Sequence, residues 1–290
     1  MIKRWIEAMR LRTLPVSVAG VITGIACALL QGTFNAVPAV LCLLFALLAQ
    51  IASNFANEYF DFKNGIDRKG RAGFRRGVTE GDIASSLMKK AAYGMLFAAA
   101  LVGCAMLIYG PWWLLFVGIA IMIFALAYSA GPYPLSHHGL GDVAVVFFFG
   151  IVPVTFTCYL QTGSWASLPV ALPASVATGF LAANVLVVNN YRDADDDALV
   201  GKRTTVVLFG RKAMSITYLL SGCVAMAVMY PVWARLALPA LLAPAVYLLL
   251  HIRTWHSLRR AQGAALNPIL GRTARNLLLF ALLFLLGTQF

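Results

Sequence analysis

The chain has 290 residues, of which 61% are hydrophobic and only 12% are charged, and its mean hydropathy is +0.80. Soluble domains carry about 25% charged residues, so this composition excludes an ordinary soluble protein. The net charge of +12 suits a nucleic-acid partner, but the basic residues stand between long apolar segments. That placement argues against nucleic acid and predicts a polytopic membrane protein.

Apolar segments close to the ~20 residues needed to cross a bilayer core recur along the whole chain. In chain order they cover residues 14–31, 38–60, 88–109, 111–129, 141–161, 168–191, 212–231, 234–252 and 271–288. The predicted turns at Gly110-Pro111 and at Pro231-Val-Trp233 are very short. We therefore expect an all-α integral membrane protein with nine transmembrane helices.

The basic residues are distributed unequally between the two sides that these segments define. On this topology 22 of the 23 basic residues lie on the side of the N-terminus, and only Arg235 lies opposite. The positive-inside rule makes that side cytoplasmic, with the N-terminus inside and the C-terminus outside. All 11 acidic residues fall on the same side, so we expect an active site near the cytoplasmic face of the inner (cytoplasmic) membrane.

Two polar stripes interrupt the apolar pattern, each where an apolar segment ends. The first is Asn57-Glu-Tyr-Phe-Asp61, followed by Asp67, and the second is Asn189-Asn-Tyr-Arg-Asp193, followed by Asp197. Residues four apart share one face of a helix. Asp67 reaches that face only if the helix ends first, and Asn64-Gly65 is the expected break.

The two stripes are related by a constant offset of 132 residues, and similar sequences lead into them. We interpret the chain as two four-helix repeats followed by a ninth helix. An even number of spans per repeat gives both copies the same orientation. Both stripes then reach the same membrane surface and face each other across a central cavity.

Carboxylate and amide oxygens at facing positions suit Mg²⁺, which binds a few carboxylates together with phosphate oxygens. Facing carboxylates also need counter-charge, which two Mg²⁺ ions would supply, and a diphosphate fits between the two metals. The predicted metal ligands are Asn57, Asp61, Asp67, Asn189, Asp193 and Asp197. Of these we predict catalytic roles for Asp61, Asp193 and Asp197, and we expect the diphosphate to be bound by Arg76, Arg192, Lys202 and Arg203.

The segment from Gly131 to Asp142 is rich in Pro and Gly and contains the pair His137-His138. Adjacent residues do not share a helix face and no Cys or third His is near, so we interpret the segment as an ordered connector rather than a metal site. Tyr133 and Asp142 either line the cavity near an acceptor or belong to a purely structural loop. The sequence leaves both interpretations open.

The two stripes resemble the two Asp-rich motifs of the UbiA superfamily of intramembrane prenyltransferases, and the resemblance covers nearly the whole chain. Other segments resemble the branch that prenylates 1,4-dihydroxy-2-naphthoate on the menaquinone pathway. These are Arg10-Leu-Arg-Thr-Leu-Pro15, Gly131-Pro-Tyr-Pro-Leu135 and Gly139-Leu-Gly-Asp142. The chain departs from the family pattern in having Glu58 where Asp is usual and Asp142 where the branch often has Glu.

The resemblance implies a single prenyltransferase domain over residues 1–290, with nine helices around a central cavity that opens to the lipid bilayer. Its Asp-rich cytoplasmic loops would lie near residues 61–87 and 192–211. The implied reaction is the Mg²⁺-dependent transfer of a polyprenyl group from polyprenyl diphosphate to 1,4-dihydroxy-2-naphthoate. Loss of CO₂ and diphosphate would give demethylmenaquinone.

Two alternatives to this function stay open. The first keeps the reaction class but changes the aromatic acceptor to 4-hydroxybenzoate, haem or homogentisate. The second is a secondary transporter, because internal repeats also characterise that class. Transporter ion sites lie near the bilayer midplane, whereas the acidic residues of this chain cluster at one face.

Overall fold

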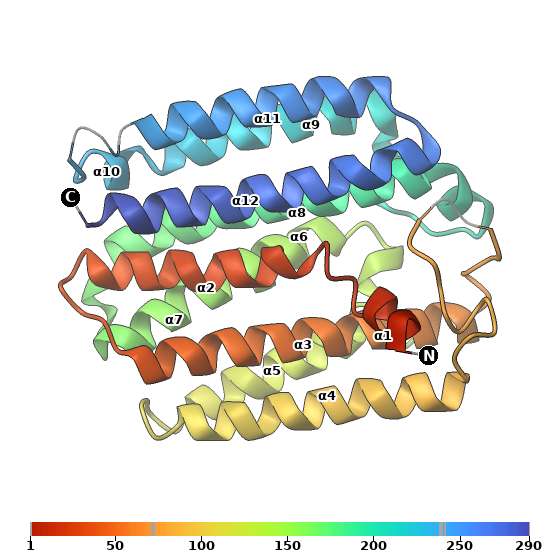
Figure 1. The fold of residues 1–290 in the computed structure, drawn as a ribbon, viewed down its shortest axis with the longest axis horizontal. Helices are drawn as coiled ribbons and strands as arrows, with labels where there is room; N and C mark the ends of the chain where they lie inside the picture. Colours follow the sequence, from red (N-terminus) through yellow and green to blue (C-terminus); the bar gives the residue numbers. More distant parts are fainter. Residues whose placement is uncertain (1, 71–72, 238–239, 241, 290) are drawn as a thin grey trace.

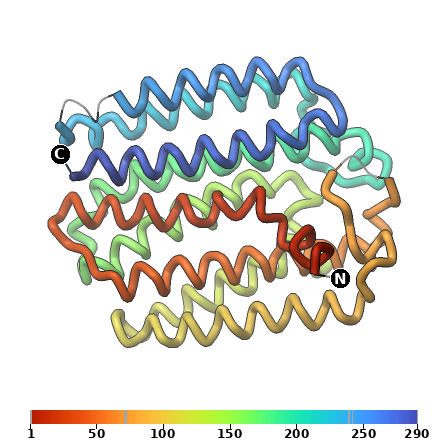
Figure 2. The backbone as a smooth tube through the Cα atoms, in the orientation of Figure 1, coloured from red at the N-terminus to blue at the C-terminus, as the bar shows by residue number. Residues whose placement is uncertain are grey.

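The computed structural model describes residues 2–70, 73–237, 240 and 242–289. Within these residues every regular element is helical, and the long helices run side by side in one bundle (Figure 1). The two termini lie at opposite ends of this bundle, the N-terminus beside the long loop that follows α3 (Ala36–Lys63) (Figure 2). The predicted all-α class is confirmed.

The helices of the first half enclose most of the space in which the polar stripes meet. In chain order they are α1 (Ile2–Ala8), α2 (Leu14–Leu29), α3, α4 (Ser85–Met106), α5 (Leu114–Ala127), a 3₁₀ turn (Leu135–His137), α6 (Gly141–Val145), a π-helical segment (Val146–Ile151) and α7 (Val152–Thr162). The π-helical segment joins α6 to α7 without a break. These three elements together form one long helical segment of residues 141–162.

The second half is organised around one long helix, α8 (Leu168–Leu199), which packs against α2, α9, α12 and the π-helical segment. The remaining elements are a 3₁₀ turn (Trp165–Ser167), α9 (Thr205–Val228), α10 (Tyr230–Trp233), α11 (Leu242–Arg260), a 3₁₀ turn (Gly263–Leu266) and α12 (Asn267–Gly287). Within the most apolar part of residues 165–199, 72% of the residues are buried. α8 is therefore the most enclosed of the membrane-crossing candidates, and it carries the second polar stripe.

Close packing onto α8 depends on two glycines. A Cβ on Gly150 of the π-helical segment would collide with the Cα of Gly179 on α8. Small residues at such crossings let helix backbones approach each other inside a membrane, where van der Waals contact drives association. The π-helical turn and the glycine pair together bring residues 146–151 against α8.

Five helical segments of the described residues are long and apolar enough to cross a membrane. They cover residues 36–63, 85–106, 141–162, 165–199 and 263–287. Leu14–Leu29 and Leu114–Ala127 are shorter apolar helices, and the predicted spans 212–231 and 234–252 correspond to α9 and α11. The count of nine spans and the two-repeat organisation stay predictions.

Two predicted span boundaries differ from the helices observed. The span predicted at 168–191 ends too early, because α8 continues to Leu199 and carries its charged residues as helical residues. The span predicted at 234–252 begins too early, because α11 starts at Leu242. Part of that prediction, residues 238, 239 and 241, lies outside the described residues. Hydropathy marks the apolar part of a helix, whereas paired charges let the helix itself continue.

Candidate active site

The first polar stripe lies on the last turns of α3. Asn57 and Asp61 are buried on one face, and Asn57 Nδ2 donates to Asp61 Oδ2 at 3.0 Å. The same amide nitrogen donates to Ser129 Oγ at 2.8 Å. Its oxygen accepts from Arg10 Nη2 at 2.6 Å and from Arg76 Nη1 at 3.2 Å. Asn57 therefore joins α3 to three other segments of the chain.

The helix break after α3 turns Asp67 back toward the stripe. α3 ends at Lys63, and Gly65 takes a φ of +69°, a conformation that glycine adopts without steric cost. The backbone N–H of Ile66 then donates to the carbonyl of Asp61 at 2.8 Å. Asp67 is buried, with Arg76 Nε 3.3 Å from its Oδ2. The break expected at Asn64-Gly65 is confirmed.

Arg10 is a site residue that sequence reasoning placed in a family-like segment without giving it a role. Its φ of +54° is the one left-handed non-glycine conformation among the described residues. Such strain persists only where surrounding contacts fix it, and it concentrates at functional sites. Burial lowers the pKa of the Arg10 guanidinium, and the carboxylates of Glu58, Asp67 and Asp61 oppose that shift. Arg10 thus supplies positive charge to a buried carboxylate cluster.

The second polar stripe lies on the last turns of α8, where Arg192 and Asp193 form a buried bidentate pair. Arg192 Nε donates to Asp193 Oδ1 at 2.7 Å, and Arg192 Nη2 donates to Asp193 Oδ2 at 2.8 Å. Arg192 also donates to Asn189 Oδ1 and to Asn267 Oδ1, each at 2.9 Å. We expected the Arg192 guanidinium to bind the diphosphate. In the structure it instead donates to Asp193 and orients that carboxylate.

Asp197 completes the second stripe one turn further along α8. Its side chain is 1% exposed, and Lys202 Nζ lies 3.6 Å from its Oδ1. The backbone N–H of Lys202 donates to the Asp197 carbonyl at 2.8 Å. This turn folds Lys202 back beside the carboxylate. The predicted spacing of Asn189, Asp193 and Asp197 along one helix is thus observed.

The loop after α3 contacts both stripes. Near the first stripe, Glu58 Oε1 accepts the backbone N–H of Val78 at 3.0 Å. Near the second, a Cβ on Gly73 would lie 2.8 Å from Arg192 Nη2, and the Phe74 ring centroid lies 5.5 Å from the Arg192 guanidinium carbon. Glu58, which the sequence presented as a substitute for a metal-binding Asp, holds this loop with one carboxylate oxygen.

The donor set at the stripes fits a divalent cation. Asp61 Oδ1 is buried and accepts no hydrogen bond, and His137 Nε2 stands 3.7 Å away. A buried carboxylate oxygen in this state is stabilised by a nearby cation. Within the described part of the chain no three Asp, Glu, His or Cys side chains form one metal-binding group. Carboxylate and amide oxygens are the donor type that suits Mg²⁺, which takes only one or two carboxylates and completes its coordination with water and phosphate.

His137 is the second site residue that sequence reasoning missed. The 3₁₀ turn Leu135–His137 and the strand-like bridge between His138 and Arg203 hold the loop after α5 over the end of α8. The backbone N–H of Arg203 donates to the His137 carbonyl at 2.9 Å. The Arg203 side chain itself is exposed, so the structure shows its backbone, not its guanidinium, contacting the site loop.

Two predicted acceptor residues lie away from the main cavity. Tyr133 is 57% exposed and stacks on His138, with ring centroids 3.6 Å apart. Asp142 Oδ2 accepts a hydrogen bond from Thr205 Oγ1 at 2.6 Å and lines a separate cavity between α6, α8 and α9. Of the two interpretations that the sequence leaves open, these positions favour the structural loop, because the loop turns Tyr133 outward and α6 turns Asp142 toward α9.

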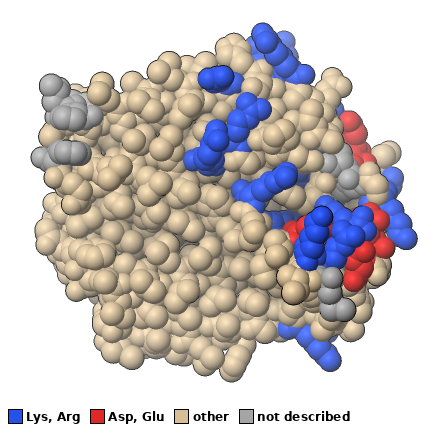
Figure 3. Space-filling view, viewed as in Figure 1, with Lys and Arg blue, Asp and Glu red and all other residues tan. Residues whose placement is uncertain are grey.

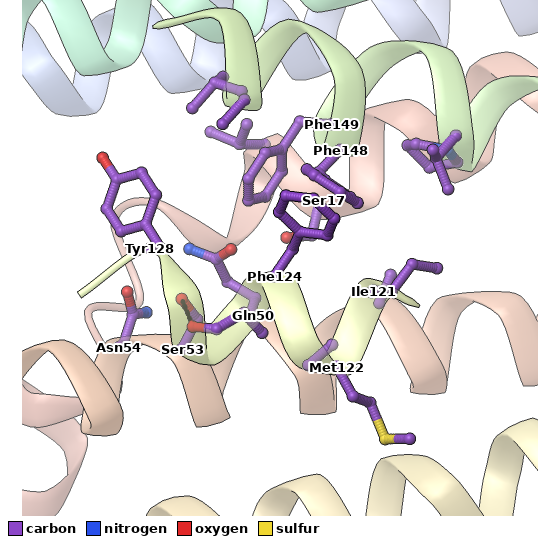
Figure 4. A pocket seen from close by; sticks show the side chains of 18 of the residues that line it. Ser17, Gln50, Ser53, Asn54, Ile121, Met122, Phe124, Tyr128, Phe148 and Phe149 are labelled. Atoms are coloured by element: carbon purple, nitrogen blue, oxygen red, sulfur yellow. Dashed lines mark hydrogen bonds between the residues drawn. The ribbon is translucent and has the colours of Figure 1, made fainter. Parts of the chain in front are cut away.

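The main cavity, about 320 Å³ in volume, begins at the two stripes and continues between α2, α3, α5, α8 and the π-helical segment. Beyond Asn57 its wall carries a short polar row on α3, with Asn54, Ser53 and Gln50, opposite Tyr128 (Figure 4). Beyond that row the walls are apolar and include Phe124, Met122, Ile121, Phe148 and Phe149. The cavity therefore has a charged mouth, a neutral polar middle and an apolar interior.

Charged side chains of the molecule gather at the end of the bundle where the charged mouth of the cavity lies. Figure 3 shows the acidic side chains and most of the basic ones at the end of the bundle that holds the N-terminus, while the remainder of that face is almost free of charge. Several helices apolar enough to cross a membrane, enclosing a cavity with a charged mouth and apolar walls, define an integral membrane protein with an internal cavity.

Comparisons with known proteins give this class its family. The UbiA prenyltransferase family matches residues 17–286. The 1,4-dihydroxy-2-naphthoate octaprenyltransferase of Escherichia coli strain K12 is 35% identical over 98% of this chain and 94% of its own length. The enzyme of that name from Mycobacterium tuberculosis is 33% identical, over 96% and 94% of the two chains. The chain belongs to the UbiA prenyltransferase family, and it is a multi-pass membrane prenyltransferase.

Solved structures agree on the fold. The apo structure of a UbiA homologue from Aeropyrum pernix K1 superposes with a TM-score of 0.74 at 15% identity and covers 93% of this chain and 97% of its own. A UbiA homologue from Archaeoglobus fulgidus bound to GPP and Mg²⁺ gives a TM-score of 0.70 at 16% identity, over 99% and 100% of the chains. The family that the sequence resemblance predicts is confirmed by the match over residues 17–286 and by the named relatives, and these structures show the same fold.

Proposed function

We propose that this enzyme transfers a polyprenyl group from polyprenyl diphosphate to 1,4-dihydroxy-2-naphthoate, releasing diphosphate and CO₂ and giving demethylmenaquinol, the reduced form of demethylmenaquinone. The observation that carries the proposal is the cavity, whose charged mouth and apolar interior match the two parts of a prenyl diphosphate. The relatives from Escherichia coli and Mycobacterium tuberculosis indicate which acceptor to propose, because both are named for 1,4-dihydroxy-2-naphthoate.

In this proposal the two stripes hold Mg²⁺, with two ions expected, and the bound metal neutralises the leaving diphosphate. The ligands are those predicted from the sequence: Asn57, Asp61, Asp67, Asn189, Asp193 and Asp197. Support comes from the buried Asp61 oxygen that accepts no hydrogen bond. Support also comes from the Archaeoglobus fulgidus homologue, which is bound to GPP and Mg²⁺.

The basic residues divide into two roles. Arg76 and Lys202 line the cavity and are proposed to bind diphosphate oxygens, and Arg10 joins them because it lines the same mouth. Arg192 is proposed to orient Asp193, since its guanidinium is committed to that carboxylate. Guanidinium groups fixed before the reaction stabilise the charge that develops on the leaving group without reorganising.

The acceptor is proposed to lie between the α3 polar row and Tyr128. Gln50 forms no hydrogen bond with the described residues, and its amide enters the cavity (Figure 4). Such neutral donors and acceptors suit the hydroxyl groups of a dihydroxynaphthoate ring. The ring carbon that bears the carboxyl group forms the new C–C bond as the allylic C–O bond breaks. Loss of CO₂ from the carboxylate on that carbon then restores the aromatic ring, while the apolar walls exclude water.

The topology belongs to the same proposal. Nine spans in one domain, built as two four-helix repeats and a ninth helix, would place the N-terminus and both stripes on the cytoplasmic side and the C-terminus outside. The gathering of charge at the end of the bundle near the N-terminus supports this orientation (Figure 3). The apolar surface along the helices supports direct contact with the lipid bilayer.

An acceptor panel tests the function. Purified protein receives a polyprenyl diphosphate with 1,4-dihydroxy-2-naphthoate, 4-hydroxybenzoate, haem or homogentisate, each with and without EDTA. We expect product and CO₂ only with the naphthoate, loss of product with EDTA, and recovery on adding excess Mg²⁺. Product from another acceptor without CO₂ would reassign the substrate. Ion movement across vesicles with no prenylated product would favour the transporter alternative.

A further inference from the structure

Four arginines form a cluster on neighbouring faces of α11 and α12, away from the active site. Arg253 and Arg260 lie seven residues apart on one face of α11, with Ser257 between them. Arg272 and Arg275 lie three residues apart on α12. Residues at these spacings share a helix face. We call Arg253, Arg260, Arg272 and Arg275 the arginine cluster.

Two hydrogen bonds bring these faces together. Arg272 Nη1 donates to Ser257 Oγ at 3.4 Å. About one turn further into the helices, Asn276 Nδ2 donates to Thr254 Oγ1 at 3.0 Å. Since α11 and α12 are antiparallel neighbours (Figure 1), these contacts place Arg260 near the level of Arg272 and Arg253 near the level of Arg275.

The arginine cluster has no balancing acid. No acidic residue follows Asp197 in the sequence. Within the residues that the structure describes, none of the four guanidinium groups forms an ion pair. Figure 3 shows basic side chains over α11 and α12, with the acidic ones confined to the far edge of that view. Four like charges on one surface repel each other unless an anion binds between them.

The arginine cluster is not confined to the helix ends, because two of its members lie well inside their helices. Arg253 stands seven residues before the end of α11 and Arg275 eight residues after the start of α12, so each lies about 10 Å along its helix at 1.5 Å per residue. Trp255 lies at the same level, its indole N–H donating to the Ser215 carbonyl at 2.8 Å. A tryptophan of this kind is typical of the headgroup region of a bilayer.

We propose that the arginine cluster binds the phosphate of an anionic phospholipid. Charge complementarity and depth carry the inference: three exposed arginines and the half-buried Arg272 at headgroup level, with no ion-pair partner among the described carboxylates, fit a phosphodiester carried by a lipid. Guanidinium groups bind phosphate oxygens in pairs through their planar donors. The bound lipid would bridge α11 and α12, and α12 begins at Asn267, which accepts a hydrogen bond from Arg192 in the active site.

Lipid retention tests the proposal. The purified full chain in neutral detergent is titrated with dioleoylphosphatidylglycerol or dioleoylphosphatidylcholine, and bound lipid is counted by native mass spectrometry. We expect a clear preference for phosphatidylglycerol. Because one arginine near an anionic headgroup contributes roughly a fivefold change in binding, the double variant R253Q/R275Q should lose at least tenfold. Each single variant should lose about fivefold, which keeps the test available if the double variant does not fold.

The matched control is R68Q/K69Q, which removes the same charge from exposed positions of the loop after α3. It should keep the preference. The proposal is overturned if wild type shows no preference, or if the control loses as much as R253Q/R275Q. Displacement of the lipid by 10-fold excess inorganic phosphate would indicate a free-anion site instead. A raised KM for the prenyl diphosphate in R253Q/R275Q, measured in phosphatidylcholine, would indicate a donor-docking site and would also overturn the proposal.

Discussion

The two polar stripes each carry an Asn and an Asp four residues apart, yet they obtain their counter-charges in different ways. On α8, Asp193 is paired with the adjacent Arg192, and Asp197 with Lys202 just beyond the helix end. On α3, Asn57 and Asp61 depend on Arg10, Arg76 and His137, which come from other segments. The α8 stripe is assembled by its own helix, and the α3 stripe by tertiary contacts.

Because of this difference, substitutions at the two stripes should affect activity and stability in different proportions. A substitution on α8 removes a group and also leaves its local partner buried and uncompensated. A substitution on α3 removes a group whose partners are distant and are shared among several contacts. Equivalent substitutions in the two stripes should therefore have similar effects on activity and different effects on stability.

The largest expected effect is on activity, in Asp61→Asn and Asp193→Asn. Each replaces a proposed Mg²⁺ ligand by a neutral amide, and we expect kcat/KM for prenyl transfer to fall by about 10²–10³-fold. Initial rates at saturating Mg²⁺ measure the loss. Asp195→Asn is the matched control, since Asp195 is exposed and paired with Arg211. Full activity in either Asp61→Asn or Asp193→Asn would remove that residue from the metal site.

The next largest effect is on stability, and it is expected in only one of the same two variants. Asp193→Asn leaves the Arg192 charge buried without its bidentate partner, which costs about 3 kcal/mol or more. Asp61→Asn breaks no ion pair of hydrogen-bonding distance, since His137 Nε2 lies 3.7 Å away. We expect a lower midpoint of thermal unfolding only in Asp193→Asn. Equal midpoints would show that the two stripes are supported in the same way.

How much of this site the sequence predicts follows from the same contrast. Helix periodicity is local, so the shared faces of Asn57 with Asp61 and of Asn189 with Asp193 and Asp197 are predictable, as is the break before Asp67. The resemblance also predicts the family. Arg10 and His137 join the site through tertiary contacts. The sequence draws attention to the segment from Arg10 to Pro15 and to the pair His137-His138, but it gives neither residue a role, and the left-handed φ of Arg10 is visible only in a structure.

Loop orientation is the other part that the sequence does not determine. Tyr133 and Asp142 stand in a segment rich in Pro and Gly, where no periodic face defines a direction. Stacking on His138 turns Tyr133 outward, and the hydrogen bond from Thr205 holds Asp142 at α9. The polar row of Gln50, Ser53 and Asn54 lies within an apolar helix. Which way these side chains face is known only once the structure shows the cavity that they line.

Arg10→Ala tests the tertiary support of the α3 stripe. The change removes the guanidinium that donates to Asn57 Oδ1 at 2.6 Å and reduces the positive charge at the cavity mouth. A charge-assisted hydrogen bond contributes about 1.5–3 kcal/mol, so kcat/KM should fall by at least tenfold. Arg12→Ala is the matched control, because Arg12 is exposed in the same segment. Equal activity in the two variants would show that Arg10 has only a structural role.

Gly73→Ala tests whether the loop after α3 couples the two stripes. The new Cβ would lie 2.8 Å from Arg192 Nη2, so either the loop or the guanidinium must move. Overpacking of this kind costs about 1 kcal/mol or more, and we expect a roughly fivefold loss of kcat/KM. Gly94→Ala on α4 is the control, since its Cβ would meet no atom within 4 Å. Wild-type kinetics in Gly73→Ala would mean that the loop does not transmit strain to α8.

Glu58→Gln carries the smallest expected effect and distinguishes two roles for a residue inside the first stripe. The Val78 N–H donates to Glu58 Oε1 at 3.0 Å, so a neutral amide should weaken that bond by about 1 kcal/mol and change kcat/KM by less than threefold. Amide hydrogen exchange at Val78 should become faster, while Glu7→Gln, a change at an acid that pairs with Arg4, should leave it unaltered. If Glu58→Gln instead abolished Mg²⁺-dependent transfer as Asp61→Asn is expected to do, Glu58 would be a metal ligand. The loop contact would then be secondary, and the α3 stripe would differ from the α8 stripe by one additional carboxylate.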